Sequence, residues 1–479
     1  MSEAGKFHRS LNLFDSTAIV IGSMIGSGIF IVSADMARNL GSPGWMLIVW
    51  IISGLMTISA ALSYGELAGI MPKAGGIYVY LREAYSPLFG FLYGWTLFIV
   101  IQSGTISAVA MAFGKYLGVL VPGISEDHIF FRLGTFTINF NQLIAIFSVL
   151  LLTWINSKGI EQGKKVQNVF TFSKIFILLI FVLIGFAFTK PFVSQNWWQA
   201  SKSANGIQIP IEGLALIAAI GMSMVGALFS SDAWYDLTFT SGEVKNPRRT
   251  IPRALFLGTL VVSIFYFLIN LVYIKALPIH GFPNGTNIAE QGIQFATEDR
   301  VATAVMWQIL GYSAGIIMAI VVVISTFGCN NGLILSGARV YYAMAGDSLF
   351  FKRAAKLNDK GVPEFGLWMQ AAWCTLLCLS GSYLQLLDYV IFAALIFNIL
   401  TVSAVFIMRY KQPGESKRYK SFGYPIIPLF YIALCVTIEI ILLKYKPEFT
   451  WRGLYIVIAG IPVYYGWKYR AKIAELFRK

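Results

Sequence analysis

The sequence is poor in charged residues, and this scarcity sets its class. Only 13% of its 479 residues are charged, 57% are hydrophobic and the mean hydropathy is +0.68, which excludes an ordinary soluble fold. A helix crosses a bilayer with roughly 20 mostly apolar residues, whereas the strands of a membrane barrel read as about ten alternating residues. Runs such as 143–154 and 175–188 do not alternate between apolar and polar residues. We therefore predict an all-α membrane protein.

Cysteine and histidine are also scarce, which argues against a disulfide framework, a metal site or a cofactor. The four cysteines all fall inside predicted spans: Cys329, Cys374, Cys378 and Cys435. Cys374 and Cys378 share one helix face, but without a third ligand nearby we interpret them as small packing residues. The three histidines lie in separate loops or span ends: His8, His128 and His280. No metal and no cofactor are predicted.

The formal net charge of +14 could suggest a nucleic-acid partner, but the basic residues are segregated by loop. Most of the 37 Lys and Arg fall on the side of the N-terminus, with the strongest clusters in loops 352–360 and 411–420. Cationic loops stay cytoplasmic. We therefore predict an inner (plasma) membrane protein with both termini in the cytosol, and no nucleic-acid partner. The first residues lack a short apolar region with a cleavage site, so no cleaved signal peptide is expected.

The apolar runs predict about twelve spans within one transmembrane domain, 1–479. Their ranges are 13–38, 45–71, 87–120, 141–156, 168–189, 212–240, 252–277, 301–345, 366–381, 386–410, 426–444 and 453–467. The sparse charges well inside them include Lys115, Lys174, Asp232 and Glu439. These charges form no motif of nucleophile, base or metal ligands, so no enzyme is predicted. A selectivity-filter sequence typical of channels is also missing.

The first and sixth spans share a polar, glycine-rich or serine-rich interruption at mid-membrane depth. It falls at Gly26-Ser27-Gly28 in the first and at Ser230-Ser231-Asp232 in the sixth. The interruptions lie five spans apart, and an odd number inverts the second unit, which predicts inverted repeats over 11–190 and 211–410 with peripheral helices in 424–468. Two facing breaks would offer N–H groups to a carboxylate and carbonyls to an ammonium, which fits an amino acid. Close packing through small residues is the alternative.

Three motifs resemble one family. The stretch 22–30, GSMIGSGIF, looks like the first-helix signature of the amino acid-polyamine-organocation superfamily. The stretches 66–78, ELAGIMPKAGGIY, and 243–252, EVKNPRRTIP, resemble its segments between helices 2 and 3 and between helices 6 and 7. The resemblance is strongest to the L-type carriers. It implies a LeuT-like fold with discontinuous helices 1 and 6, alternating access and, commonly, exchange of one amino acid for another.

The resemblance also implies the substrate-binding residues. The family's backbone clamp falls on these positions: Met24, Ile25, Gly26, Ser27, Gly28, Phe229, Ser230 and Ser231. Phe229 matches the aromatic lid above the substrate, although it could also be an ordinary core or lipid-facing aromatic. Tyr235 continues the helix 6 motif, and Ile101 and Thr105 align with the pocket wall.

Lys174 lies in an apolar span, where a charge exposed to lipid would cost several kcal/mol. It matches a family lysine that takes the place of the cation of sodium-coupled relatives, which implies sodium-independent transport. Carbonyls near Gly26 and the hydroxyls of Ser325 or Thr326 are its predicted acceptors. The alternative is a lysine that snorkels to the cytoplasmic interface.

Asp232 bears on specificity, because many L-type carriers have a small residue at this position. A carboxylate there would face the substrate side chain and favour cationic substrates. N-capping of the restarted helix explains the same residue in a carrier of neutral amino acids, and we leave both interpretations open.

The sequence thus predicts a sodium-independent transporter, and an exchanger, of neutral and also cationic L-amino acids. A proton-coupled amino-acid or polyamine symporter is the alternative. Animal light chains of the family join a heavy chain through a cysteine in the loop between helices 3 and 4. Loop 121–140 contains no cysteine, so no disulfide-linked heavy chain is expected.

Overall fold

The computed structural model describes residues 7–121, 123–124, 128–133, 136–189, 196–204, 206–380, 383–416 and 420–476. Some predictions fall outside these ranges: the end of the ninth span at Gly381, residue 190 at the end of the first repeat, part of basic loop 411–420, and the two chain ends.

The first half of the chain forms a broken helix followed by longer ones. Its elements are α1 (Leu13–Met24), α2 (Gly28–Leu40), α3 (Pro43–Ile70), α4 (Ile77–Ala84), α5 (Pro87–Thr96), the π-helix η1 (Leu97–Ile101), α6 (Gln102–Leu120), β1 (Ile129–Leu133), β2 (Phe136–Asn139), α7 (Phe140–Ser157) and α8 (Ile160–Phe188). The turn η1 lies within one continuous predicted span, so α5, η1 and α6 form a single helical rod.

The second half begins in the same way, with an interrupted helix. Its elements are β3 (Ser201–Ala204), β4 (Ile207–Pro210), α9 (Gly213–Ser230), α10 (Asp236–Phe239), η2 (Ser241–Glu243), α11 (Pro247–Ala276), α12 (Ile288–Gln291), η3 (Thr297–Asp299), α13 (Val301–Leu310), η4 (Gly311–Ser313), α14 (Ala314–Gly346), η5 (Lys352–Ala355), α15 (Glu364–Ser380), α16 (Tyr383–Lys411), α17 (Pro413–Ser416), α18 (Ile426–Tyr445) and α19 (Pro447–Leu476).

Membrane-length helices dominate the fold. Within the described residues, nine helices are long and apolar enough to cross a bilayer, and α1 with α2 makes a tenth if the bent pair is one span. Helices also cover the predicted ninth and twelfth spans. However, α15 has 17 residues within the part of the chain that the structure describes, fewer than the roughly 20 that a span needs. In α19, Arg452 and Pro462 interrupt the apolar stretch. The chain is therefore an all-helical, multi-pass membrane protein.

The predicted eighth span, 301–345, is wrong as one helix. The chain breaks at Gly311, whose φ is +62°, and helix α14 restarts at Ala314. A single helix of that length would be about 68 Å long, more than twice the roughly 30 Å of a bilayer core. Two other predicted spans begin too late, because α8 starts at Ile160 and α11 at Pro247. Polar residues continue these helices beyond the apolar stretch.

Two short antiparallel hairpins, β1–β2 and β3–β4, were not predicted. The sequence does carry a signal for the second one. Asn205-Gly206 stands between two short runs, and an Asn-Gly pair is a strong hairpin signal. Both hairpins lie in connections between long helices, so the all-helical class of the spanning region is unchanged.

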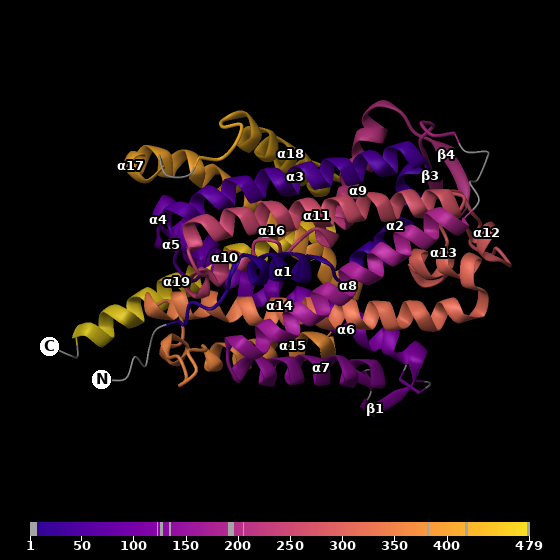
Figure 1. The fold of residues 1–479 in the computed structure, drawn as a ribbon. Helices are drawn as coiled ribbons and strands as arrows, with labels where there is room; N and C mark the ends of the chain where they lie inside the picture. The colour runs from indigo at the N-terminus through magenta and orange to yellow at the C-terminus, as the bar shows by residue number, and fades with distance from the viewer. Residues whose placement is uncertain are drawn as a thin grey trace.

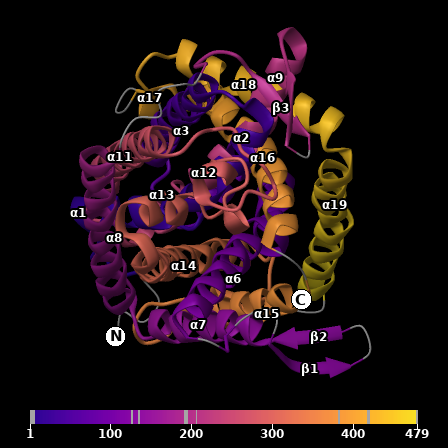
Figure 2. The same ribbon diagram turned by 90° about the vertical axis from the view of Figure 1, so that its right-hand side faces the viewer.

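The helices form two groups around the interrupted pair (Figure 1). Helices α3, α9 and α11 lie on one side, α6, α7, α14 and α15 on the other, and α1 and α10 between them. The view along the bundle again places α3, α9 and α11 in its upper part and α6, α7, α14 and α15 in its lower part (Figure 2). The C-terminal part of α19 and helix α17 lie at one end, called the terminal end below, and β3–β4 and α12 lie at the other, called the hairpin end.

Candidate functional site

The first interruption separates α1 from α2, which meet at 43°. Ile25 has extended backbone angles, φ −79° and ψ 94°, and α2 restarts at Gly28. An interrupted helix leaves its last carbonyls and first N–H groups without partners inside the helix, and lipid cannot supply them. The break lies where the glycines predicted it.

The second interruption covers residues 231–235, between α9 and α10. Ala233 has a φ of +63°, which residues other than glycine rarely adopt. The Asp232 carboxylate accepts a hydrogen bond from the Tyr235 hydroxyl at 3.3 Å. Tyr235 itself precedes α10, and no side chain caps that helix. The N-cap interpretation of Asp232 is therefore wrong.

The two breaks touch each other, and glycine makes this contact possible. A Cβ on Gly28 would lie 2.4 Å from the Ser230 hydroxyl oxygen, whereas a Cβ on Gly26 would lie 3.2 Å from the Cys329 sulfur. Real Cβ atoms essentially never come within 3.0 Å of another heavy atom. A side chain at position 28 would therefore push the two breaks apart, and one at position 26 would meet a milder contact.

A cavity with an empty volume of about 290 Å³ lies between the breaks. It is lined by Ser23, Met24, Gly26, Ser27, Gly28, Thr105, Val109, Phe229, Ser230, Asp232, Ala233 and Cys329. Eight of these residues were singled out from the sequence, and the structure brings them together. The other four are Ser23, Val109, Ala233 and Cys329. Val109 follows Thr105 by one helical turn, a spacing that could have identified it.

Four other residues singled out from the sequence do not line this cavity. Ile25 is fully buried. Ile101 ends η1, and its carbonyl accepts the Thr105 hydroxyl at 2.7 Å. Ser231 lines a second cavity, and Tyr235 reaches the site through Asp232.

Lys174 is the middle residue of α8 and is 2% exposed, so the snorkelling interpretation is wrong. Its ammonium donates to three carbonyls: Gly22 at 2.9 Å, Ile25 at 2.8 Å and Ser325 at 3.0 Å. The predicted hydroxyl acceptors were wrong in detail. The Ser325 hydroxyl donates to the carbonyls of Ile25 and Gly26, at 3.1 and 3.0 Å. The Thr326 hydroxyl donates to the Val322 carbonyl within its own helix, at 2.7 Å.

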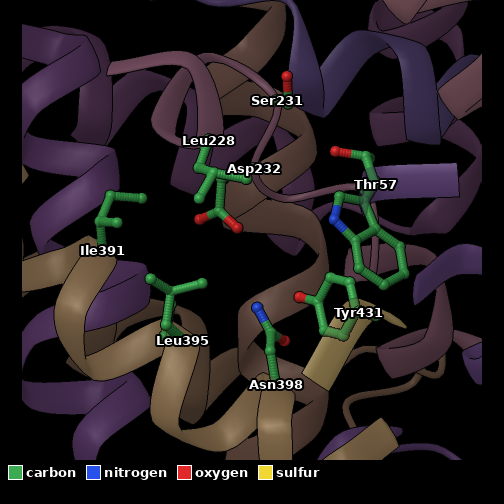
Figure 3. Close-up of a pocket in the computed structure, with 10 residues that line it drawn as sticks. Thr57, Leu228, Ser231, Asp232, Ile391, Leu395, Asn398 and Tyr431 are labelled. Atoms are coloured by element: carbon green, nitrogen blue, oxygen red, sulfur yellow. The ribbon is translucent and has the colours of Figure 1, made fainter. Parts of the chain in front are cut away.

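Asp232 also lines a second cavity, with an empty volume of about 340 Å³. Its carboxylate points into this space, where the Asn398 amide and the Tyr431 hydroxyl also point (Figure 3). Tyr431 comes from α18, a helix that the sequence placed at the periphery. Tyr64 donates to Asn398 at 2.5 Å and so fixes that amide. Asp232 is thus shared by two adjoining cavities.

Tyr266 of α11 is a residue at the breaks that sequence reasoning missed. Its hydroxyl lies 3.2 Å from the Met24 carbonyl oxygen and 2.9 Å from that of Ser230. These residues end α1 and α9. A tyrosine in an apolar helix gives no signal of such a contact, because the contact depends on tertiary packing.

Ion pairs hold each end of the bundle. At the terminal end, Arg339 pairs with Glu243 at 2.8 Å, and both side chains are 1% exposed. Arg409 pairs with the fully buried Glu66 at 2.7 Å. The Arg82 guanidinium also contacts the Asp347 carboxylate.

At the hairpin end, Arg38 pairs with Asp299 at 2.6 Å. Glu298 accepts from Lys115 at 2.9 Å and from Arg300 at 2.7 Å. Partial burial acts to raise the pKa of Glu298, but the hydrogen bond from Lys115 and the charges of Arg300 and Lys115 outweigh it and hold that pKa below its usual range. Glu298 and Asp299 both have positive φ, +53° and +60°, so this turn combines backbone strain with ion pairing.

Two interrupted helices that face a cavity inside a bundle of membrane-length helices define a membrane transport protein. The chain also matches the family model described as "Amino acid permease" over residues 11–464. It belongs to this family, a family of amino-acid transporters and not of enzymes. Among the described residues, no three His, Cys, Asp or Glu side chains come together as a metal site.

Similar proteins come from animals and bacteria. "Large neutral amino acids transporter small subunit 2" of Mus musculus is 29% identical over 478 residues, 98% of this chain and 84% of the relative. "Serine/threonine exchanger SteT" of Bacillus subtilis (strain 168) is 28% identical over 473 residues, 98% and 99% of the two chains. "b(0,+)-type amino acid transporter 1" of Mus musculus is 26% identical over 455 residues, 94% and 85%. The resemblance to L-type carriers is thereby confirmed.

Proposed function

We propose that the protein is a sodium-independent exchanger of L-amino acids that works by alternating access and accepts neutral and also cationic substrates. The observation that carries this proposal is the cavity enclosed by the two helix breaks, with Asp232 on its wall. The names of relatives that describe exchange and transport of amino acids support it.

The substrate's common groups would bind the main chain at the breaks. The N-terminus of α2, at Gly28, carries partial positive charge and suits a carboxylate, whereas the carbonyl ends of α1 and α9 suit an ammonium. These groups are the same for every amino acid. Binding there accounts for recognition of the class but not for a choice among side chains. Phe229 lines the same cavity and would cover the bound substrate.

Lys174 supports sodium independence. Its ammonium donates to three carbonyl oxygens near the first break. Without the lysine, such a set of oxygen atoms would suit a small cation. A fixed cation on the protein would do the structural work of a bound ion without requiring a sodium gradient.

Asp232 supports the inclusion of cationic substrates. It lines both cavities, and its carboxylate, which accepts a hydrogen bond from the Tyr235 hydroxyl at 3.3 Å, points into the second one. A positively charged substrate side chain that enters the second cavity would form an ion pair with the Asp232 carboxylate, whereas a neutral side chain would not.

The proposal also includes the topology of the chain in the membrane. We expect twelve spans in a LeuT-like fold, with inverted repeats over 11–190 and 211–410, peripheral helices in 424–468, and both termini in the cytosol of the plasma membrane. We also expect the chain to act without a disulfide-linked heavy chain, because loop 121–140 has no cysteine.

Purified protein in proteoliposomes tests the function. Vesicles preloaded with unlabelled amino acid should take up labelled amino acid much faster than empty vesicles, with and without sodium. Uptake that ignores preloading but follows an imposed pH gradient would contradict exchange and support the proton-coupled symporter. A competition panel of unlabelled amino acids and polyamines in the same vesicles would then identify the preferred substrates.

A further inference from the structure

The Tyr266 hydroxyl stands where the two breaks meet. It lies within hydrogen-bond distance of the Met24 and Ser230 carbonyls, at 3.2 and 2.9 Å. Each carbonyl belongs to the last residue of an interrupted helix, so neither has the usual partner four residues further on. Tyr266 itself is 1% exposed, which leaves little solvent to compete for these bonds.

One hydroxyl serves both carbonyls with a single proton. The two carbonyls share that proton in a three-centre hydrogen bond. A carbonyl oxygen has two lone pairs, so each oxygen keeps acceptor capacity beside the cavity that Met24 and Ser230 line. Tyr266 therefore holds the two helix ends close together and still leaves their carbonyls able to accept.

The other polar contacts of the first break come from a different part of the fold. Lys174 of α8, Ser325 of α14 and Cys329 of α14 all bind carbonyls between Gly22 and Gly26. Tyr266 comes from α11, which packs along α1 and α3. Its contacts thus join one break to the other, whereas Lys174 joins the first break to α8 and α14.

We propose that Tyr266 is a positioning residue that couples the two breaks through its hydroxyl, so that they present their main-chain groups to the substrate at a fixed separation. This inference rests on the proposed function. Because the groups it positions bind the part common to all amino acids, its effect on affinity is the same for every side chain.

A matched control lies on the same helix. Tyr273 follows two turns later, is also fully buried, and donates to the Ile29 carbonyl at 3.2 Å. Ile29 lies within α2, so this hydroxyl touches one segment only and bridges no break. Tyr266→Phe and Tyr273→Phe therefore remove the same atom from similar surroundings, and the bridge is lost in Tyr266→Phe alone.

The experiment measures KM and Vmax in proteoliposomes for a small neutral, a large neutral and a cationic amino acid. Tyr266→Phe should raise KM about tenfold, the effect of one lost hydrogen bond, by the same factor for all three substrates. Tyr273→Phe should change KM less than about twofold. An unchanged KM in Tyr266→Phe, equal changes in both variants, or a change confined to one substrate would overturn the proposal.

A second variant keeps the test open if Tyr266→Phe does not fold. Trp50 packs edge-on against the Tyr266 ring, with centroids 5.4 Å apart, and lines neither cavity. Trp50→Phe should loosen the tyrosine and raise KM severalfold for all three substrates, and an unchanged KM would contradict the coupling. If the wild-type protein neither binds nor transports amino acids, the proposed function itself fails, which is a different result.

Discussion

The two helix breaks resemble each other in outline and differ in what surrounds them. Around the first, a buried lysine, a serine and a cysteine bind its carbonyls from α8 and α14. Around the second, the contacts come from α3 and α11: Ser231 meets Ser53 at 3.4 Å, Tyr266 donates to Ser230 at 2.9 Å, and Tyr64 packs against Trp234. The first break is thus held by a buried cation, and the second by hydroxyl groups and aromatic rings. Under the proposed function, the main-chain groups of both breaks bind what all substrates share, and Asp232 of the second break distinguishes their side chains.

The largest effect is expected at Lys174. Lys174→Ala removes the ammonium from three buried carbonyls, of which that of Ile25 keeps the Ser325 hydroxyl as a donor. A buried acceptor left unsatisfied costs about 1–3 kcal/mol, and the first break should lose its conformation. Uptake of every amino acid in proteoliposomes should fall to background. Lys115→Ala is the control, because its partner Glu298 lies at the hairpin end. Substantial uptake by Lys174→Ala would mean that the first break does not depend on the ammonium.

The next effect is expected where the breaks touch. Gly28→Ala places a methyl group 2.4 Å from the Ser230 hydroxyl oxygen, and Gly26→Ala places one 3.2 Å from the Cys329 sulfur. We expect Gly28→Ala to lower Vmax/KM by about a hundredfold and Gly26→Ala by about tenfold or less, as overpacking of about 1–3 kcal/mol implies. Initial uptake rates measure both. The reverse order would show that separation of the breaks is not limiting.

A selective effect is expected at Asp232. Asp232→Gly removes the carboxylate between the two cavities and should reduce uptake of arginine relative to leucine by about tenfold, the contribution of one partly solvated ion pair. Competition of both unlabelled amino acids against one labelled substrate gives the ratio directly. Equal losses for arginine and leucine would show that the second break does not read side chains.

The smallest effect is expected at the hairpin end, and it depends on pH. The pKa of Glu298 is lowered in the folded protein, so its ion pairs stabilise the fold above the usual glutamate pKa and lose that contribution as the pH falls through the lowered value. In detergent, the Tm of the wild type should fall more between neutral and acidic pH than that of Glu298→Gln. High salt should reduce the difference, because these side chains are half exposed. Identical pH profiles would assign the turn no electrostatic role.

Much of the site could be predicted from the sequence because its signals are local. Glycine and serine inside an apolar run indicated both breaks, and a lysine in such a run indicated a buried cation. The position of Lys174 at the centre of α8 was not predictable in the same way, since polar residues extend that helix past the apolar stretch. The hydropathy of a segment indicates whether it lies in lipid, but it does not indicate the residue at which the helix ends.

Other parts of the site depend on contacts between distant segments. Nothing around Tyr266, Cys329 or Tyr431 in the sequence distinguishes them from ordinary core residues, and their roles follow only from the packing of α11, α14 and α18 against the breaks. Gly311 was missed for another reason. It is one glycine among 44, and most glycines in membrane helices mark close packing and not a break.

The π-helix η1 affects which neighbouring helices are contacted by the two parts of the α5–η1–α6 rod. Such a turn adds one residue to the winding, so everything after it is rotated by about 100° about the axis. Before it, Trp95 donates to Ile456 of α19 at 3.0 Å; after it, Gln102 donates to Leu333 of α14 at 2.8 Å, and Thr105 lines the cavity. If the same residues wound as a regular α-helix, Thr105 would turn away from the cavity, whereas deleting a single residue from 97–101 would remove the π turn and leave Thr105 on its present face.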